Sequence, residues 1–211
     1  MTITRKILQG AAVGVGVADR PEDLDVIHKA GVAATLWRRA PLPSFQDWID
    51  SLPAEALPRA RVILRPEAVH EAVTGICDTA GTPDGPERAR LIDDIAAQAG
   101  IFADLMRARF LRLRLDVIAH DACRKFHIDA ITARLICTYR GTGTQYGIST
   151  DGTEPTRIFT TPTGSPLILR GTLWPTDPPA GLLHRSPPIA GTGETRLVLV
   201  LDPVSDPDDA I

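Results

Sequence analysis

Residues 123–143, CRKFHIDAITARLICTYRGTG, contain the pattern around which the rest of the chain can be interpreted. His127 and Asp129 are separated only by Ile128, and an apolar run ending in Tyr139 follows them. In an extended chain, residues i and i+2 project from the same face. An imidazole and a carboxylate are therefore expected to point at one spot, while Ile128 points the opposite way into the core.

The chain around this stretch has the pattern of a β domain. Residues 111–116, LRLRLD, alternate apolar and charged side chains, as a half-buried strand does. Further strand-like runs lie at 131–139, 145–148, 157–160, 166–171, 181–184 and 195–201. Turns rich in glycine and proline separate these runs, and we find no convincing helix among them. Many short strands joined in this way predict an antiparallel jelly roll, a double-stranded β-helix.

The first half of the chain has a mixed pattern. Helices are predicted at about 21–30, after a capping box at 44–47, at 66–78 and at 86–109, with strands at 32–37 and 61–64. The predicted fold class is α+β, with an N-terminal helical and mixed part, residues 1–109, packed on the jelly-roll sheet. The metal-binding core would span 110–202 and a loose tail 203–211, all within one structural domain.

Composition excludes several classes of function. The 211 residues carry a net charge of −3 at pH 7, which gives no electrostatic reason to expect nucleic acid or an anionic membrane as a partner. The three cysteines have no CxxC spacing, which argues against a disulfide framework and favours a reducing compartment. The apolar run near the N-terminus is too short to span a membrane. We therefore expect a cytoplasmic protein whose substrate and oligomeric state the sequence does not identify.

A third candidate metal ligand is His184, which ends the apolar run of the segment GLLHRSPP. Two imidazoles and one carboxylate form the facial triad of mononuclear non-haem iron, which leaves coordination positions open for substrate and O₂. Arg196, on the strand predicted after His184, suits the distal carboxylate of a 2-oxo acid, because guanidinium binds carboxylates with two parallel hydrogen bonds. The predicted cofactors are Fe(II) and 2-oxoglutarate, with Zn as the alternative metal.

Three further residues have both a functional and a structural interpretation. Arg134 is a rival anchor for the oxo acid, although a structural salt bridge, with Asp116 for example, also explains an arginine in an apolar run. Tyr139 is a candidate hydrogen-bond partner of a bound oxo acid, or a core residue. Cys123 is a possible extra metal ligand, or a free thiol of the core.

The sequence resembles two families. The order His127, Asp129, His184 and Arg196 resembles that of the Fe(II)/2-oxoglutarate-dependent oxygenases, whose HxD motif lies early in a double-stranded β-helix. A closer resemblance is to the bacterial family catalogued as domain of unknown function 1826. Its motifs CRxFHxD, RLxxTYxGxGT, HRSPP and RLVLVLD match residues 123–129, 134–144, 184–188 and 196–202.

These resemblances imply three possible functions. The first is an oxygenase that hydroxylates an unknown substrate. The second possible function is a non-catalytic zinc-binding or zinc-homeostasis protein that uses the same three residues. It is suggested by the resemblance to domain of unknown function 1826, whose members are often encoded beside zinc-homeostasis genes. The third is a degenerate jelly roll that binds no metal and serves as an interaction module.

Overall fold

The computed structural model describes residues 10–207, so the N-terminal apolar run is covered only in part and residues 208–211 of the predicted tail lie outside it. The strands are β1 (Gly14–Ala18), β2 (Val32–Trp37), β3 (Ala60–Leu64), β4 (Phe110–Ile118), β5 (Ala133–Arg140), β6 (Gln145–Ile148), β7 (Phe159–Thr160), β8 (Leu167–Arg170), β9 (Leu182–Arg185) and β10 (Arg196–Val204). The α-helices are α1 (Pro43–Ser51), α2 (Val69–Ala80) and α3 (Pro86–Met106), and the 3-10 helices are η1 (Pro21–His28), η2 (Ala54–Ala56) and η3 (Pro66–Ala68).

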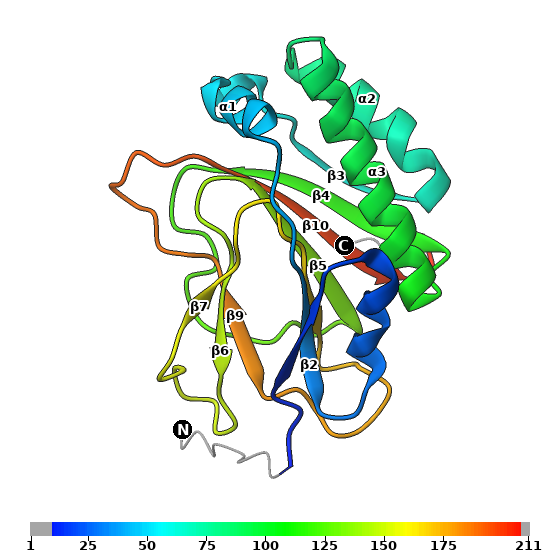
Figure 1. The fold of residues 1–211 in the computed structure, drawn as a ribbon, viewed down its shortest axis with the longest axis vertical. Helices are drawn as coiled ribbons and strands as arrows, with labels where there is room; N and C mark the ends of the chain where they lie inside the picture. Colours follow the sequence, from blue (N-terminus) through cyan, green and yellow to red (C-terminus); the bar gives the residue numbers. More distant parts are fainter. Residues whose placement is uncertain (1–9, 208–211) are drawn as a thin grey trace.

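Seven strands form the main sheet in the order β1-β2-β8-β5-β10-β4-β3 (Figure 1). Its neighbours pair antiparallel except β1 and β2, which are parallel. The N-terminal part therefore adds β1 and β2 to one edge of the main sheet and β3 to the other. Its helices cover one face of the same sheet. The second sheet has the order β7-β6-β9 and lies across from the main sheet. The predicted α+β jelly roll is confirmed.

Alternation along β4 assigns the two faces of the main sheet. Leu111, Leu113 and Leu115 are fully buried in the cluster that includes the apolar side chains of α1, α2 and α3. Arg112 and Arg114 project from the opposite face, because successive side chains of a strand alternate. That opposite face meets the second sheet through a smaller apolar cluster. The polar residues of the LRLRLD pattern thus face the space between the two sheets.

Three local expectations need correction. The segment GVGVA forms strand β1, which the two glycines concealed in the sequence. The expected capping box at 44–47 is absent, because α1 begins at Pro43 after Leu42 and no side chain caps it. The predicted tail starts too early, because β10 continues to Val204.

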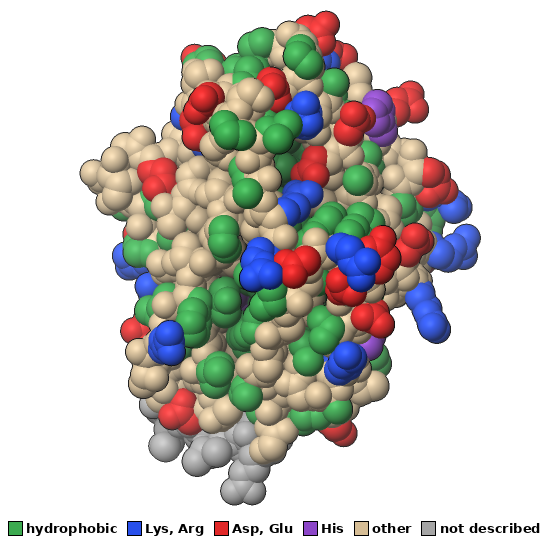
Figure 2. Space-filling model, viewed as in Figure 1, with side chains coloured by type: hydrophobic (Ala, Val, Ile, Leu, Met, Phe, Trp, Pro, Cys, Tyr) green, Lys and Arg blue, Asp and Glu red, His purple; other side chains and the backbone are tan. Residues whose placement is uncertain are grey.

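The outer surface carries charges of both signs. On the face shown in Figure 2, acidic and basic side chains are interspersed among apolar ones. None of the helices in residues 10–207 is long and apolar enough to cross a membrane.

Candidate metal centre

The two histidines of the candidate site are brought together by the backbone. The N–H of His127 donates to the carbonyl oxygen of His184, and the N–H of His184 donates to that of His127, each at 3.0 Å. His184 lies on β9, and His127 extends the second sheet by this isolated antiparallel bridge. The centroids of the two imidazole rings are 4.5 Å apart.

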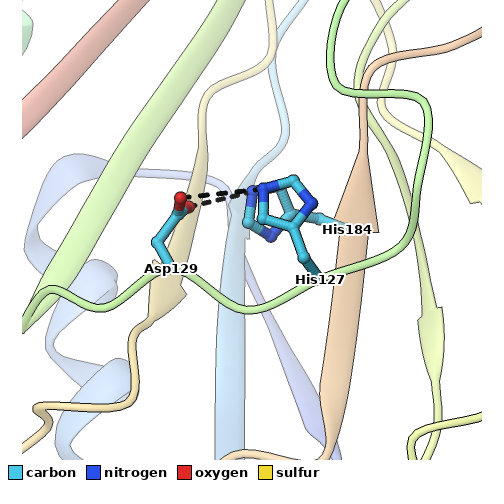
Figure 3. Close-up of side chains that lie close together, drawn as sticks. All are labelled: His127, Asp129 and His184. Carbon is cyan, nitrogen blue, oxygen red and sulfur yellow. Dashed lines mark ion pairs between the residues drawn. The ribbon is translucent and has the colours of Figure 1, made fainter.

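Asp129 completes the cluster from the same segment as His127. Its Oδ2 is 3.1 Å from Nε2 of His184, and its Oδ1 is 3.6 Å from Nε2 of His127. The three candidate ligand atoms all lie within 4.8 Å of one another, and Figure 3 shows the side chains converging. The carbonyl oxygen of Asp129 accepts the N–H of Thr172, which fixes the turn that carries it. The residues of the predicted triad therefore do meet.

Neighbouring groups orient these side chains. Nδ1 of His127 is 2.8 Å from the carbonyl oxygen of Lys125. When Nδ1 carries the proton and donates it there, the lone pair of Nε2 faces the cluster, as metal-binding histidines require. Arg134 contacts the same oxygen of Asp129 as His184 does, with Nη1 2.6 Å from Oδ2.

The three side chains differ in their protonation behaviour. Burial would raise the pKa of Asp129, but contacts with His127 and His184 and the charge of Arg134 hold it well below its ordinary value. The contact with Asp129 raises the pKa of His127, against the effect of burial. Burial lowers the pKa of His184 despite the neighbouring carboxylate. A carboxylate and a neutral His184 are therefore available as ligands at neutral pH.

These residues fit a divalent metal ion. Oδ2 of Asp129 is buried and lies close to two nitrogens, Nη1 of Arg134 at 2.6 Å and Nε2 of His184 at 3.1 Å. The carboxylate and the two imidazoles also converge within 4.8 Å, which is the arrangement that a set of metal ligands needs. Two imidazole nitrogens and one carboxylate oxygen suit iron or zinc, and three protein ligands leave positions open.

The cluster opens into a cavity of about 300 Å³ between the two sheets. Its lining consists of Arg114, Asp116, Ile118, Ala122, Cys123, His127, Asp129, Arg134, Ile136, Thr144, His184, Arg185, Ser186, Arg196, Val198 and Val200. The polar side chains of this lining include residues of β4, β5, β9 and β10, so four strands contribute to one site.

Arg196 is almost completely buried in the wall of this cavity, with 1% of its surface exposed. Its guanidinium donates to the carbonyl oxygen of Thr142 and to the hydroxyls of Ser186 and Thr138. Among residues 10–207, no carboxylate lies within ion-pair distance of it. Burial lowers the pKa of Arg196 to about 10, opposed only by the charge of Glu194.

Arg134 has a different environment. Its Nε and Nη2 donate to the two carboxylate oxygens of Asp202, at 2.7 and 2.8 Å, while Nη1 contacts Asp129. The guanidinium is thus already occupied by two carboxylates. The structural salt bridge considered from the sequence exists, but its partners are Asp202 and Asp129 and not Asp116.

Tyr139 and Cys123 lie outside the cluster. The hydroxyl of Tyr139 donates to Asp94 and accepts from Gln98, on the helix-covered face of the sheet. Its assignment to an oxo-acid site needs correction, because Thr138 projects toward Arg196 and Tyr139, its neighbour on the strand, projects the opposite way. Cys123 is exposed and lines the cavity, but it is not in the group of three converging ligands.

The family model described as Protein of unknown function (DUF1826) matches residues 18–202. The chain belongs to this family. No curated protein matches the chain.

Solved structures share the fold of this chain. The chain is similar to dioxygenase for auxin oxidation 1 from Arabidopsis thaliana, solved as a binary complex with 2-oxoglutarate, with a TM-score of 0.56 at 12% identity over 94% of this chain and 95% of that one. It is also similar to the dioxygenase for auxin oxidation of rice, with a TM-score of 0.52 at 12% identity over 93% and 84% of the two chains. This DUF1826 protein therefore has the jelly-roll fold of 2-oxoglutarate-dependent oxygenases.

Two residues of the site were missed in the sequence. Asp202 ends the apolar run of β10, and Arg114 belongs to the alternating pattern of β4. The alternation itself was visible, but it was interpreted as a solvent-facing side. The signal that could have identified them is the presence of charges on strands that a jelly roll covers on both faces.

Proposed function

We propose that this DUF1826 protein is a mononuclear Fe(II)/2-oxoglutarate-dependent oxygenase that hydroxylates a substrate C–H bond. The observation that carries the proposal is the pairing of two features in one cavity. Arg196, a buried arginine with no carboxylate of residues 10–207 within ion-pair distance, lines the same cavity as the cluster of His127, Asp129 and His184. The first feature suits an anion and the second suits a metal ion.

His127, Asp129 and His184 would hold the iron, which when bound supplies the activation of O₂ at the expense of 2-oxoglutarate. Arg134 would keep the Asp129 carboxylate ionised and oriented, and Lys125 would fix the tautomer of His127 through its carbonyl oxygen. Arg196, with the hydroxyls of Ser186 and Thr138, would bind the distal carboxylate of 2-oxoglutarate. The surrounding apolar side chains of β5 and β10 would exclude water from the reacting groups.

The geometry supports the oxygenase over the two alternatives. A structural zinc site closes its fourth position with a protein ligand, but Cys123 is not part of the cluster. A degenerate jelly roll gives no reason for two imidazoles and a carboxylate to converge within 4.8 Å at a cavity. The cysteines, free in this structure, support the reducing cytoplasm that we propose as its location.

The test is anaerobic addition of Fe(II) and 2-oxoglutarate to the purified protein. We expect a visible charge-transfer band in the unmutated protein, no band in His127→Ala, and an unchanged band in the control His70→Ala, whose imidazole is exposed on α2. Arg196→Gln should require a much higher 2-oxoglutarate concentration to form the band. If the unmutated protein binds Fe(II) but gives no band with 2-oxoglutarate, the proposed oxygenase is refuted.

A further inference from the structure

The arginines that line the cavity are Arg114, Arg134, Arg185 and Arg196. Two of them are neutralised by the protein. Arg134 is held by Asp202 and Asp129. Arg185 donates to the side chain of Gln145 at 2.8 Å and lies 3.7 Å from Glu154. Arg196 is assigned to 2-oxoglutarate by the proposed function. Arg114 remains without an assigned partner.

Arg114 projects from β4 into the cavity, and its Nε is buried without a hydrogen bond. No ion pair joins its guanidinium to a carboxylate in residues 10–207, although Asp202 and Asp116 attract it from farther away. Burial lowers the pKa of Arg114, and the charge of Arg134 lowers it further. The guanidinium is therefore desolvated and incompletely neutralised, so a bound anion would stabilise it.

The strand opposite Arg114 adds a second positive charge. In the antiparallel pairing of β3 with β4, the register partner of Arg114 is Arg61, which is exposed. Like charges directly opposite each other on neighbouring strands are destabilising. An anion bound to Arg114 would reduce that cost.

Beside Arg114 the cavity wall contains one carboxylate, Asp116 on the same face of β4, together with several apolar side chains. Val200 is its register partner on β10, and Ile118, Ile136 and Val198 line the same cavity. The volume of about 300 Å³ is at the lower end of the range for ligand pockets, about 300–1,000 Å³, and 2-oxoglutarate would occupy part of it. What remains is space for a compact apolar group beside a fixed cation.

We propose that the oxidised substrate is a small monocarboxylic acid with an apolar body. Its carboxylate binds the guanidinium of Arg114, Arg61 adds positive charge at the open edge, and the apolar body packs on Val198 and Val200. The inference rests on the proposed function, because that function assigns Arg196 to 2-oxoglutarate and leaves Arg114 for the substrate. Arg114 selects the charge of the substrate and takes no part in the oxidation itself.

The experiment measures ligand binding without turnover. The protein is loaded under nitrogen with Fe(II) and saturating 2-oxoglutarate, and is titrated calorimetrically with butyrate, hexanoate, benzoate and phenylacetate and with the primary amide of each. At least one acid should bind at least about tenfold more tightly than its amide, the factor that a charged hydrogen bond supplies. Arg114→Gln should abolish this preference, and Arg114→Lys should retain part of it, because the charge remains without the paired donors.

The control variant is Arg20→Gln, which removes the same charge from an exposed arginine paired with Asp23. It should keep the preference for the acid, and Arg114→Gln should keep the charge-transfer band of Fe(II) with 2-oxoglutarate. The inference is overturned if no acid binds, if acid and amide bind alike, or if Arg114→Gln retains the preference while the band is present. Absence of the band in the unmutated protein would instead refute the proposed function, and this inference with it.

Discussion

The main-chain groups of His127 and His184 are hydrogen-bonded to each other in both directions, with both N–H···O distances at 3.0 Å. The separation of the two imidazoles is thus set by backbone pairing and not by the side chains themselves. The segment that contains His127 and Asp129 is hydrogen-bonded to β9 at His184. The site is consequently pre-formed by the sheet, and its ligands can be replaced without removing what positions them.

This pairing predicts that ligand variants stay folded. When no metal is added, the free energies of unfolding of His127→Ala and His184→Ala should lie within about 1 kcal/mol of that of the unmutated protein, because the backbone hydrogen bonds remain. Zn²⁺ at about 100 times its dissociation constant should stabilise the unmutated protein by about 2.7 kcal/mol and should stabilise neither variant. Thermal unfolding with and without Zn²⁺ measures this, with His70→Ala as control. Equal stabilisation of all four proteins would show that the metal binds elsewhere.

Replacement of Arg134 and of Arg196 should destabilise the protein to different extents. Arg134→Gln leaves Asp202, which is 1% exposed, without its two-pronged partner and should lower the free energy of unfolding by about 3 kcal/mol. Arg196→Gln removes a buried charge that pairs with no carboxylate in the described part of the chain, and it should change the free energy of unfolding by no more than about 1 kcal/mol. Urea unfolding of the metal-free variants tests the contrast. A larger loss in Arg196→Gln than in Arg134→Gln would contradict our assignment of the two arginines.

Tyr139→Phe separates the two roles considered for this residue. The variant loses a hydroxyl that donates to Asp94 at 2.6 Å and accepts from Gln98, and should lose about 1–2 kcal/mol of stability. Because the hydroxyl lies on the helix-covered face, the affinity for 2-oxoglutarate should not change. Urea unfolding and titration of the charge-transfer band measure the two quantities. A weaker 2-oxoglutarate affinity with unchanged stability would restore Tyr139 to the oxo-acid site.

The Asp94 network predicts how stability depends on pH. Burial would raise the pKa of Asp94, but its paired hydrogen bonds with Arg39, at 2.6 and 2.7 Å, and those from Tyr139 and Gln98 lower it below 3.8. A lowered folded-state pKa contributes stability that is fully present above the unfolded value and is lost as the pH falls through the folded value. Asp94→Asn should therefore cost about 3 kcal/mol at pH 7, and the difference should shrink below about pH 4. Urea unfolding across this range tests it, and a difference that does not change with pH would contradict the assignment.

Much of the fold follows from local patterns in the sequence. The alternation of LRLRLD identifies β4, and the helical spacing of apolar residues identifies α3. Strand β1 could not be recognised, because Gly14 and Gly16 have low strand propensity. Gly16 is required for a tertiary reason, since a Cβ there would lie 2.6 Å from a methyl group of Val26 on η1. A glycine that is required by such tertiary packing cannot be recognised from the residues next to it in the sequence.

The cluster of His127, Asp129 and His184 was predictable in its residues but not in its surroundings. The spacing of His127 and Asp129 and the position of His184 at a strand end predicted the three converging side chains. The partner of Arg134 was not predictable, because it depends on the register in which β10 pairs with β5 and β4. That register brings Asp202 between Arg112 and Arg134, and no local feature of the sequence specifies it. Only the three-dimensional pairing distinguishes the occupied arginine from the available one.

Strand β10 lies between β5 and β4 in the middle of the main sheet, although it follows every other strand of residues 10–207 in the chain. During synthesis on the ribosome, β4 and β5 therefore cannot pair with β10 until nearly all of this region has emerged. Until then each has an unpaired strand edge, which is a surface prone to aggregation. Arg196 also begins this strand, so the cavity is completed in the same late step that closes the sheet. The nascent protein is thus expected to form the cavity only after β10 has emerged and paired, and to depend on chaperones until then.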